Sequence, residues 1–229
     1  GLTVTHMADR LCADDRLRRD SGYTWHLVAC LDPDGTRLNE GWFAGPFTRT
    51  HYARHFYRPA PDEQVEWTFP FAYKRAYFDR VLPETLALMR LIDDTRPTFF
   101  TTLHNGETGG VFYYLSRPVP ELQAVLKDLP GRYGVPLHAG EPEHPAIKSY
   151  EQAIYQAPTM EDAYDYLEAS GQDPVAHIGG AASDSYIRKY GTLGLTAEIP
   201  YWTDPSAGDV TPTELSYRDL ITRQAEGLR

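Results

Sequence analysis

The sequence predicts a single-domain α/β fold in which helices flank a mixed, mostly parallel β-sheet. Segments with strand character alternate with segments of helical periodicity, which is typical of α/β proteins. The chain has 229 residues, of which 41% are hydrophobic, so it is long and apolar enough to bury one sizeable core. We therefore expect one catalytic domain over residues 1–229.

Helical periodicity appears in four parts of the chain. Val4, Met7 and Leu11 share one face of an amphipathic helix over 3–13. Near the C-terminus, Thr211-Pro212-Thr213-Glu214 has the form of a capping box with proline at the first helical position. The predicted helices are residues 3–13, about 83–94, two or three stretches within 120–170, and one from the capping box to about 226.

Strand character appears in three apolar segments that turn residues delimit. They are YTWHLVACL (23–31), TFFTTLHN (98–105) and GTLGLTAEIP (191–200). Each is rich in β-branched and aromatic residues, which favours a buried strand. Residues 36–83 are rich in aromatics, proline and arginine without clean periodicity, and we expect an ordered, functional loop there.

Each predicted strand ends in polar residues that can do chemistry. Asp32-Pro33-Asp34-Gly35 follows the first strand, His104-Asn105 ends the second, and Glu198 ends the third. Ligands of open α/β sheets collect beyond the carboxyl ends of the strands. Taken alone, a histidine such as His104 is more often a hydrogen-bonded core residue than a ligand. Glu198 alone more often indicates an ion pair with a neighbouring arginine, because a buried carboxylate needs a partner.

Net charge and hydropathy exclude two classes of partner. Lys plus Arg number 22 and Asp plus Glu 32, so the net charge is −10. A general nucleic-acid binder needs a basic face, and adsorption to anionic membranes needs basic residues too. The chain has no apolar run near the length of a membrane span and no leader pattern. We expect a cytoplasmic protein, although a secreted protein whose leader has been removed would have the same composition.

In register along the chain, five segments together resemble the zinc carboxypeptidase family, also called funnelins. YTWHLVACLDPDG resembles the family's strand and Asn-Pro-Asp-Gly turn, with Asp32 in place of Asn. YARHF resembles its Asn-Arg-Asn-Phe segment. The remaining three segments, PETLALMRLI, TTLHN and GGAASDSYIRKYGTLGLTAEIP, resemble its Glu-Pro-Glu-Thr helix, the strand of its third metal ligand, and the run that ends in its catalytic carboxylate.

The resemblance implies a metallohydrolase that cleaves a C-terminal peptide bond, or an amide bond of an acylated amino acid, with a metal-activated water. It implies Zn²⁺ as the cofactor and His104 as a metal ligand. Glu198 would be the general base and acid, and Arg54 would bind the carboxylate of the substrate. A guanidinium fork matches a carboxylate, which suits that last role.

Two features depart from the family pattern near the substrate. Ala53 replaces the asparagine that neighbours the carboxylate-binding arginine. The family's mobile tyrosine upstream of Gly179-Gly180 has no evident counterpart, and His177 lies in that neighbourhood. We assign His177 as a candidate substrate contact, with an ordinary loop histidine as the alternative.

The family's first two zinc ligands, in a His-x-x-Glu motif, have no match in this sequence. The motif would fall immediately before Gly1, so we expect an N-terminal segment that this sequence lacks. Two alternatives stay open. Either the protein is a natural pseudoenzyme, or His6 and Asp9, three residues apart on the first helix, act as a substitute pair.

The sequence therefore leaves three functions open. The first is a zinc metallocarboxypeptidase-like hydrolase. The second is a non-catalytic binding module of the same fold, which recognises peptide C-termini through Arg54 without a metal. The third is an amidase acting on cell-wall peptides, an activity that the family also contains.

Overall fold

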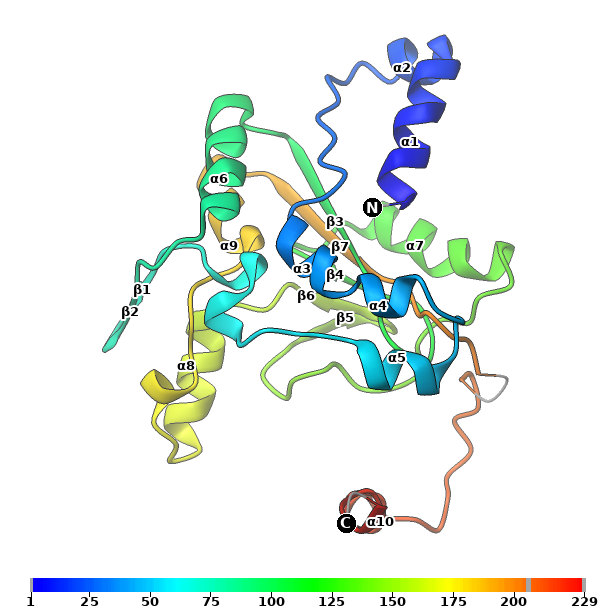
Figure 1. Cartoon of the computed structure of the whole chain (residues 1–229), viewed down its shortest axis with the longest axis vertical. Coiled ribbons are helices and arrows are strands. Elements are labelled where there is room, and N and C mark those ends of the chain that lie inside the picture. The colour runs from blue at the N-terminus through cyan, green and yellow to red at the C-terminus, as the bar shows by residue number, and fades with distance from the viewer. Residues whose placement is uncertain (1, 205–206, 228–229) are drawn as a thin grey trace. The chain divides into compact units, whose positions relative to one another are not determined.

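The chain forms an α/β structure with a five-stranded mixed sheet, seen here in a computed structural model (Figure 1). The structure describes residues 2–204 and 207–227. It comprises two compact units: one includes the residues up to Thr98 and Thr159–Thr192, and the other Phe99–Pro158 and the residues from Leu193 onward. The predicted α/β class and mixed sheet are confirmed, whereas one domain over 1–229 and a carboxypeptidase-like topology remain predictions.

The first unit holds most of the helices and a short β-hairpin. Helix α1 confirms the predicted N-terminal helix and half-buries Val4 and Met7 on one face. The elements of the first unit are α1 (Leu2–Ala13), α2 (Asp15–Asp20), α3 (Pro33–Leu38), α4 (Glu40–Phe43), α5 (Arg49–His55), η1 (Pro61–Glu63), η2 (Val65–Trp67), β1 (Phe71–Tyr73), β2 (Ala76–Phe78), α6 (Pro83–Thr95), α8 (Met160–Ala169), η3 (Pro174–Ala176), α9 (Ser183–Ile187) and η4 (Arg188–Tyr190).

Residues 23–31 are not a strand, which corrects the first strand prediction. They pair with no described strand, and Trp25, Leu27 and Val28 remain exposed. A strand needs a neighbouring strand for its backbone groups, and apolar composition alone does not supply one. The Asp32 side chain instead accepts from the backbone N–H of Gly35 and caps α3, so the predicted turn is a helix start.

The segment 36–83 is more regular than predicted. It contains α4, α5, two 3₁₀ turns and the β1–β2 hairpin. Trp42 is buried and packs edge to face against Tyr52 and face to face against Phe43, which joins α4 to α5. Aromatic packing rather than periodicity organises these short helices, and this is why the sequence pattern showed only a loop.

Helix α6 begins and ends where the sequence indicates. Pro83 occupies the first turn, where its missing N–H costs nothing, and Arg96 at the C-cap adopts a left-handed conformation. The helix buries Leu88 and Ile92 on one side. The predicted helix over about 83–94 is therefore confirmed.

The second unit is built on the five-stranded sheet, whose strand order is β3-β7-β4-β6-β5. Among the described strands, β3 pairs with β7 and β4 with β6 in parallel, while β4–β7 and β5–β6 are antiparallel. The sheet is thus mixed but not mostly parallel, which corrects that prediction. The unit's elements are β3 (Phe99–His104), β4 (Phe112–Leu115), α7 (Pro120–Arg132), β5 (Ser149–Glu151), β6 (Ile154–Gln156), β7 (Leu193–Glu198) and α10 (Tyr217–Gly227).

Helix α7 covers one face of this sheet (Figure 1). Leu126 of α7 lies in a core cluster with Tyr113 and Leu115 of β4, Ile154 of β6 and Ala197 of β7. Because side chains alternate along a strand, the neighbours of these residues point to the opposite face. That opposite face carries the polar ends of β3 and β7.

The remaining predicted helices are present with shifted bounds. Helices α7 and α8 occupy the region 120–170, as predicted, but β5 and β6 lie there as well. Helix α10 begins at Tyr217 rather than near the predicted capping box, and Ser216 and Asp219 hydrogen-bond reciprocally at its start. No helix in residues 2–204 and 207–227 is both long and apolar enough to cross a membrane.

Candidate functional site

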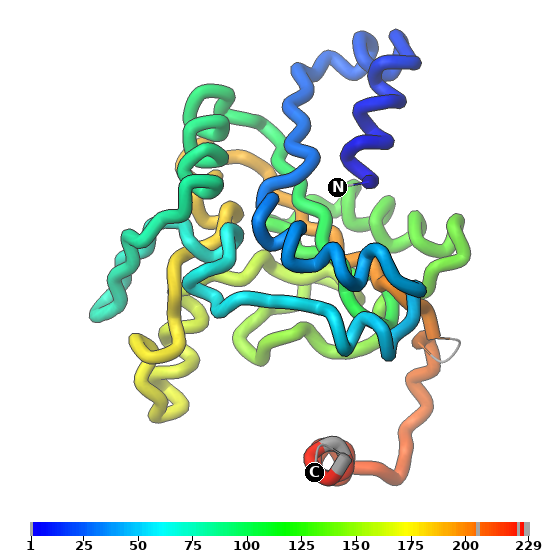
Figure 2. Tube along the Cα trace, viewed as in Figure 1, coloured from blue at the N-terminus to red at the C-terminus, as the bar shows by residue number. Residues whose placement is uncertain are grey.

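His104 and Glu198 lie side by side at the ends of two adjacent strands. β3 and β7 run parallel and side by side (Figure 2), although the paired positions are 94 residues apart in the chain. His104 is in register with Glu198. The His104 Nδ1 atom is 3.2 Å from the Glu198 Oε1 atom. The imidazole and carboxylate that the sequence predicts to converge are therefore in direct contact.

Hydrogen bonds directly after this pair fix its register. Beyond the strand ends, the backbone N–H of Ile199 donates to the His104 carbonyl at 3.2 Å. The Asn105 amide donates to the Ile199 carbonyl at 3.1 Å. A slip of one strand by one residue would turn its side chain to the other face of the sheet and separate the pair, so these bonds protect the contact.

The two partners differ in their access to solvent. The side chain of Glu198 is 11% exposed, whereas that of His104 is 36% exposed. A carboxylate buried to this degree needs a hydrogen-bonding or charged partner, and the imidazole is one. The pair thus presents a mostly buried carboxylate from the sheet, with a more exposed imidazole beside it.

The antiparallel neighbour β4 extends the same face with aromatic side chains. Phe112 is directly across from Glu198, and Tyr114 is across from Thr196. The Tyr114 hydroxyl donates to Glu143 Oε2 at 2.7 Å. Burial, this hydrogen bond and the nearby Glu198 carboxylate raise the pKa of Tyr114, so its hydroxyl stays a neutral donor.

Arg54 and His177 belong to the first unit. Arg54 is exposed in the last turn of α5, and its guanidinium forms no ion pair with a carboxylate of the described chain. His177 is exposed and caps the short η3 turn through its backbone. Both side chains are accessible for the substrate contacts that the sequence predicts, and those contacts remain predictions.

The described residues do not gather a complete zinc site. A catalytic zinc takes three protein ligands, and the described part of the chain holds no group of three or more His, Cys, Asp and Glu side chains that could bind a metal. His104 and Glu198 form a pair only. His6 and Asp9, the alternative ligand pair, are both exposed on α1.

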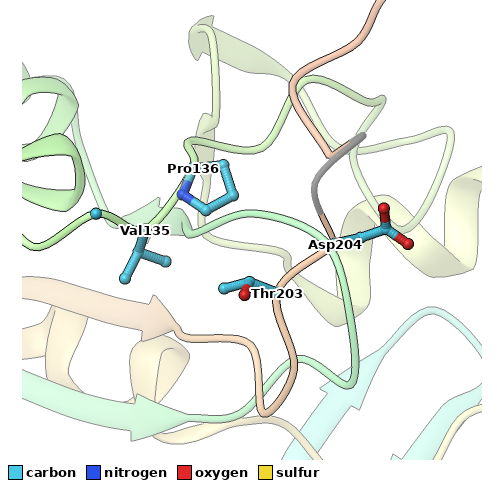
Figure 3. A pocket seen from close by; sticks show the side chains of 5 residues that line it. Val135, Pro136, Thr203 and Asp204 are labelled. Carbon is cyan, nitrogen blue, oxygen red and sulfur yellow. The ribbon is translucent and has the colours of Figure 1, made fainter.

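A hollow in the second unit lies apart from these assignments. Figure 3 shows Val135 and Pro136 on one side and Thr203 and Asp204 on the other. Gly134 completes its lining, and neither His104 nor Glu198 contributes to it. Its mixed lining of apolar and hydroxyl groups with one carboxylate matches none of the chemistry that the sequence predicts.

Sequence reasoning missed the aromatic part of the site. Tyr114 and Glu143 were not singled out because β4 was not predicted. The run Val111-Phe112-Tyr113-Tyr114-Leu115, which follows a glycine pair, carries the β-branched and aromatic signal of a short buried strand. Comparison with family models, curated proteins and solved structures gives no match for this chain.

Proposed function

We propose that this chain is a hydrolase similar to the zinc carboxypeptidases, which cleaves a C-terminal peptide bond or the amide bond of an acylated amino acid. The single observation that carries the proposal is the contact between His104 Nδ1 and Glu198 Oε1 at 3.2 Å. It occurs at the carboxyl ends of adjacent parallel strands, where α/β proteins bind their ligands. An imidazole and a carboxylate meet there, and His104 precedes Glu198 along the chain as the family pattern requires.

In this proposal Glu198 moves the proton of the reaction. Its carboxylate accepts a proton from the attacking water and then donates it to the leaving amine. The 11% exposure of its side chain leaves little bulk water to compete for that proton. His104 is the more exposed partner, and its contact with Glu198 would help to orient the carboxylate.

Arg54 and His177 would recognise the substrate. A guanidinium without an ion pair among the described residues is available to bind a C-terminal carboxylate through two parallel hydrogen bonds. His177 would be a further contact to the substrate. Both roles are expectations from the family resemblance and rest on the exposure of these side chains.

A zinc ion in this site would use His104 as one ligand. The described residues do not supply the other two ligands that a catalytic zinc needs. When bound, such an ion lowers the pKa of a coordinated water and polarises a carbonyl. The alternative, a non-catalytic module that recognises peptide C-termini, requires Arg54 but no metal.

The test combines metal content with activity. The purified protein is equilibrated with zinc, dialysed and analysed for zinc per chain, and it is assayed against a panel of N-acylated dipeptides with free C-termini. The proposal predicts hydrolysis that Glu198→Gln abolishes, and any zinc that the chain retains should be lost in His104→Ala. Glu151→Gln, an exposed partner of Lys127, is the matched control and is expected to change neither.

Two outcomes would decide against the proposal. Full hydrolytic activity in Glu198→Gln would remove the carboxylate from the mechanism. Binding of the dipeptides without cleavage, by a protein that takes up no zinc, would favour the binding module instead.

A further inference from the structure

A loop of the second unit lies against the sheet face that carries Glu198. Leu137 and Ile147, at the two ends of this loop, pack on a buried cluster that includes Phe112 and Tyr114 of β4. His138 contributes a ring contact with Phe112, whose centroid is 5.3 Å away. Because Phe112 is directly across from Glu198, the 138–147 loop borders the proposed site.

Tyr114 holds the middle of the loop. Its hydroxyl donates to Glu143 Oε2 at 2.7 Å, and the tyrosine is buried at 5% exposure. A short hydrogen bond to a carboxylate from a buried hydroxyl is among the stronger polar contacts in proteins. The Tyr114 ring also packs edge to face on Phe112, so the donor has little freedom to turn away.

Tyr155 provides a second contact one strand further on. It is paired with Tyr114 across β4 and β6, and its hydroxyl donates to the Gly140 carbonyl at 3.1 Å. A side chain at Gly140 would lie 2.8 Å from His138 Nε2, so the loop folds tightly on itself here. Two tyrosines of the sheet therefore tie two points of the loop to the face of the site.

We propose that the 138–147 loop is a wall of the Glu198 site and determines how tightly substrate binds. The hydrogen bond from Tyr114 to Glu143 holds this loop in place, and we call this hydrogen bond the latch. Tyr114 is a positioning residue in this scheme, because it acts through the loop. The inference rests on the proposed hydrolase for its functional part. The latch itself is testable without any activity.

The structural test is hydrogen–deuterium exchange of the loop amides in four variants. Tyr114→Phe and Glu143→Ala remove the latch and are expected to speed exchange within 139–146 by about two- to tenfold, the effect of one lost hydrogen bond. Glu143→Gln keeps an acceptor oxygen and should retain slow exchange. Tyr113→Phe is the matched control, since this neighbouring hydroxyl lies on the α7 face without a hydrogen bond to a described residue.

The functional test uses the same variants and the N-acylated dipeptides. Removal of the latch is expected to raise KM several-fold while kcat stays within about twofold, because the wall binds substrate but takes no part in proton transfer. Unchanged exchange in Tyr114→Phe would overturn the latch. Faster exchange with an unchanged KM, in a protein that hydrolyses the dipeptides, would overturn the role of the loop in substrate binding. If the wild-type protein does not hydrolyse the dipeptides, the proposed function is contradicted, and the latch is then tested by the exchange measurement alone.

Discussion

The hydroxyl oxygens of Thr102 and Thr196 lie 2.7 Å apart, two residues before the contact of His104 with Glu198. The two pairs lie on the same face of β3 and β7, because side chains two residues apart in a strand point the same way. A side-chain hydrogen bond thus reinforces the backbone ladder directly behind the proposed site.

Replacement of one of these threonines should destabilise the second unit. Thr102→Val keeps the shape of the side chain but removes this hydrogen bond, which contributes about 0.5–1.5 kcal/mol to the free energy of unfolding. The double variant Thr102→Val/Thr196→Val should lose less than the sum of the two single variants, because both remove the same hydrogen bond. Urea unfolding of the single and double variants measures the coupling, and strict additivity would show that the contact is unimportant.

Gly180 should tolerate no side chain. A Cβ atom there would lie 2.5 Å from the Phe69 carbonyl oxygen and 2.8 Å from that of Trp67, both on backbone that cannot move aside cheaply. Gly180→Ala is therefore expected to lose about 1–3 kcal/mol of stability or more. Gly179→Ala is the matched control, because its nearest contacts would be an ordinary 3.7 Å. Thermal unfolding compares the two, and equal melting temperatures would contradict the packing described here.

Asp93 should make stability depend on acidic pH. Hydrogen bonds from Lys189 first, and then from Tyr186 and Tyr190, lower the pKa of Asp93 from 3.8 to about 2. Since the folded-state pKa lies below the unfolded one, the contribution is present above pH 3.8 and is lost as the pH falls through about 2. Asp93→Asn should lower the melting temperature near neutral pH.

The difference between wild type and Asp93→Asn should shrink below pH 4 and vanish near pH 2. Asp94→Asn, at the exposed neighbouring position of α6, is the control and should leave the melting temperature near neutral pH unchanged. A difference for Asp93→Asn that stays constant down to pH 2 would show that these hydrogen bonds do not lower the pKa of the carboxyl group.

Arg54 should set the preference for a free C-terminus. Arg54→Ala is expected to raise KM by about tenfold for N-acylated dipeptides, the effect of losing a charge-assisted pair of hydrogen bonds. The same substrates with an amidated C-terminus should be hydrolysed poorly by wild type and no worse by the variant. Arg49→Ala, on the first turn of the same helix, should leave KM unchanged. An equal loss on both substrate classes would place Arg54 outside the carboxylate site.

The sequence predicted those elements whose signals are local. Helix α6 has a proline start and an apolar stripe, and β3 and β7 are apolar segments bounded by turn residues, so their positions could be read from the chain. Their polar ends led to His104 and Glu198, which are indeed in contact. The identity of the pair was therefore predictable, because strand ends of parallel strands meet at one edge.

The remaining features depend on partners that a local pattern cannot show. Residues 23–31 have the composition of a buried strand but no described strand to pair with. The hydrogen bond between Tyr114 and Glu143 joins positions 29 residues apart, and it requires knowing which face of β4 points toward Glu198. Registers and pairings of this kind are set by tertiary packing rather than by intrinsic propensity.

The steady-state rate of dipeptide hydrolysis by Glu198→Gln is the decisive measurement for the role of this carboxylate. Glutamine preserves the size of the side chain and its place beside His104 but cannot accept the proton of water. We predict a loss in kcat of about 10²- to 10⁴-fold, the usual contribution of a general base, with the fold intact by circular dichroism. A Glu198→Gln variant that hydrolyses these substrates at the wild-type rate would contradict the mechanism.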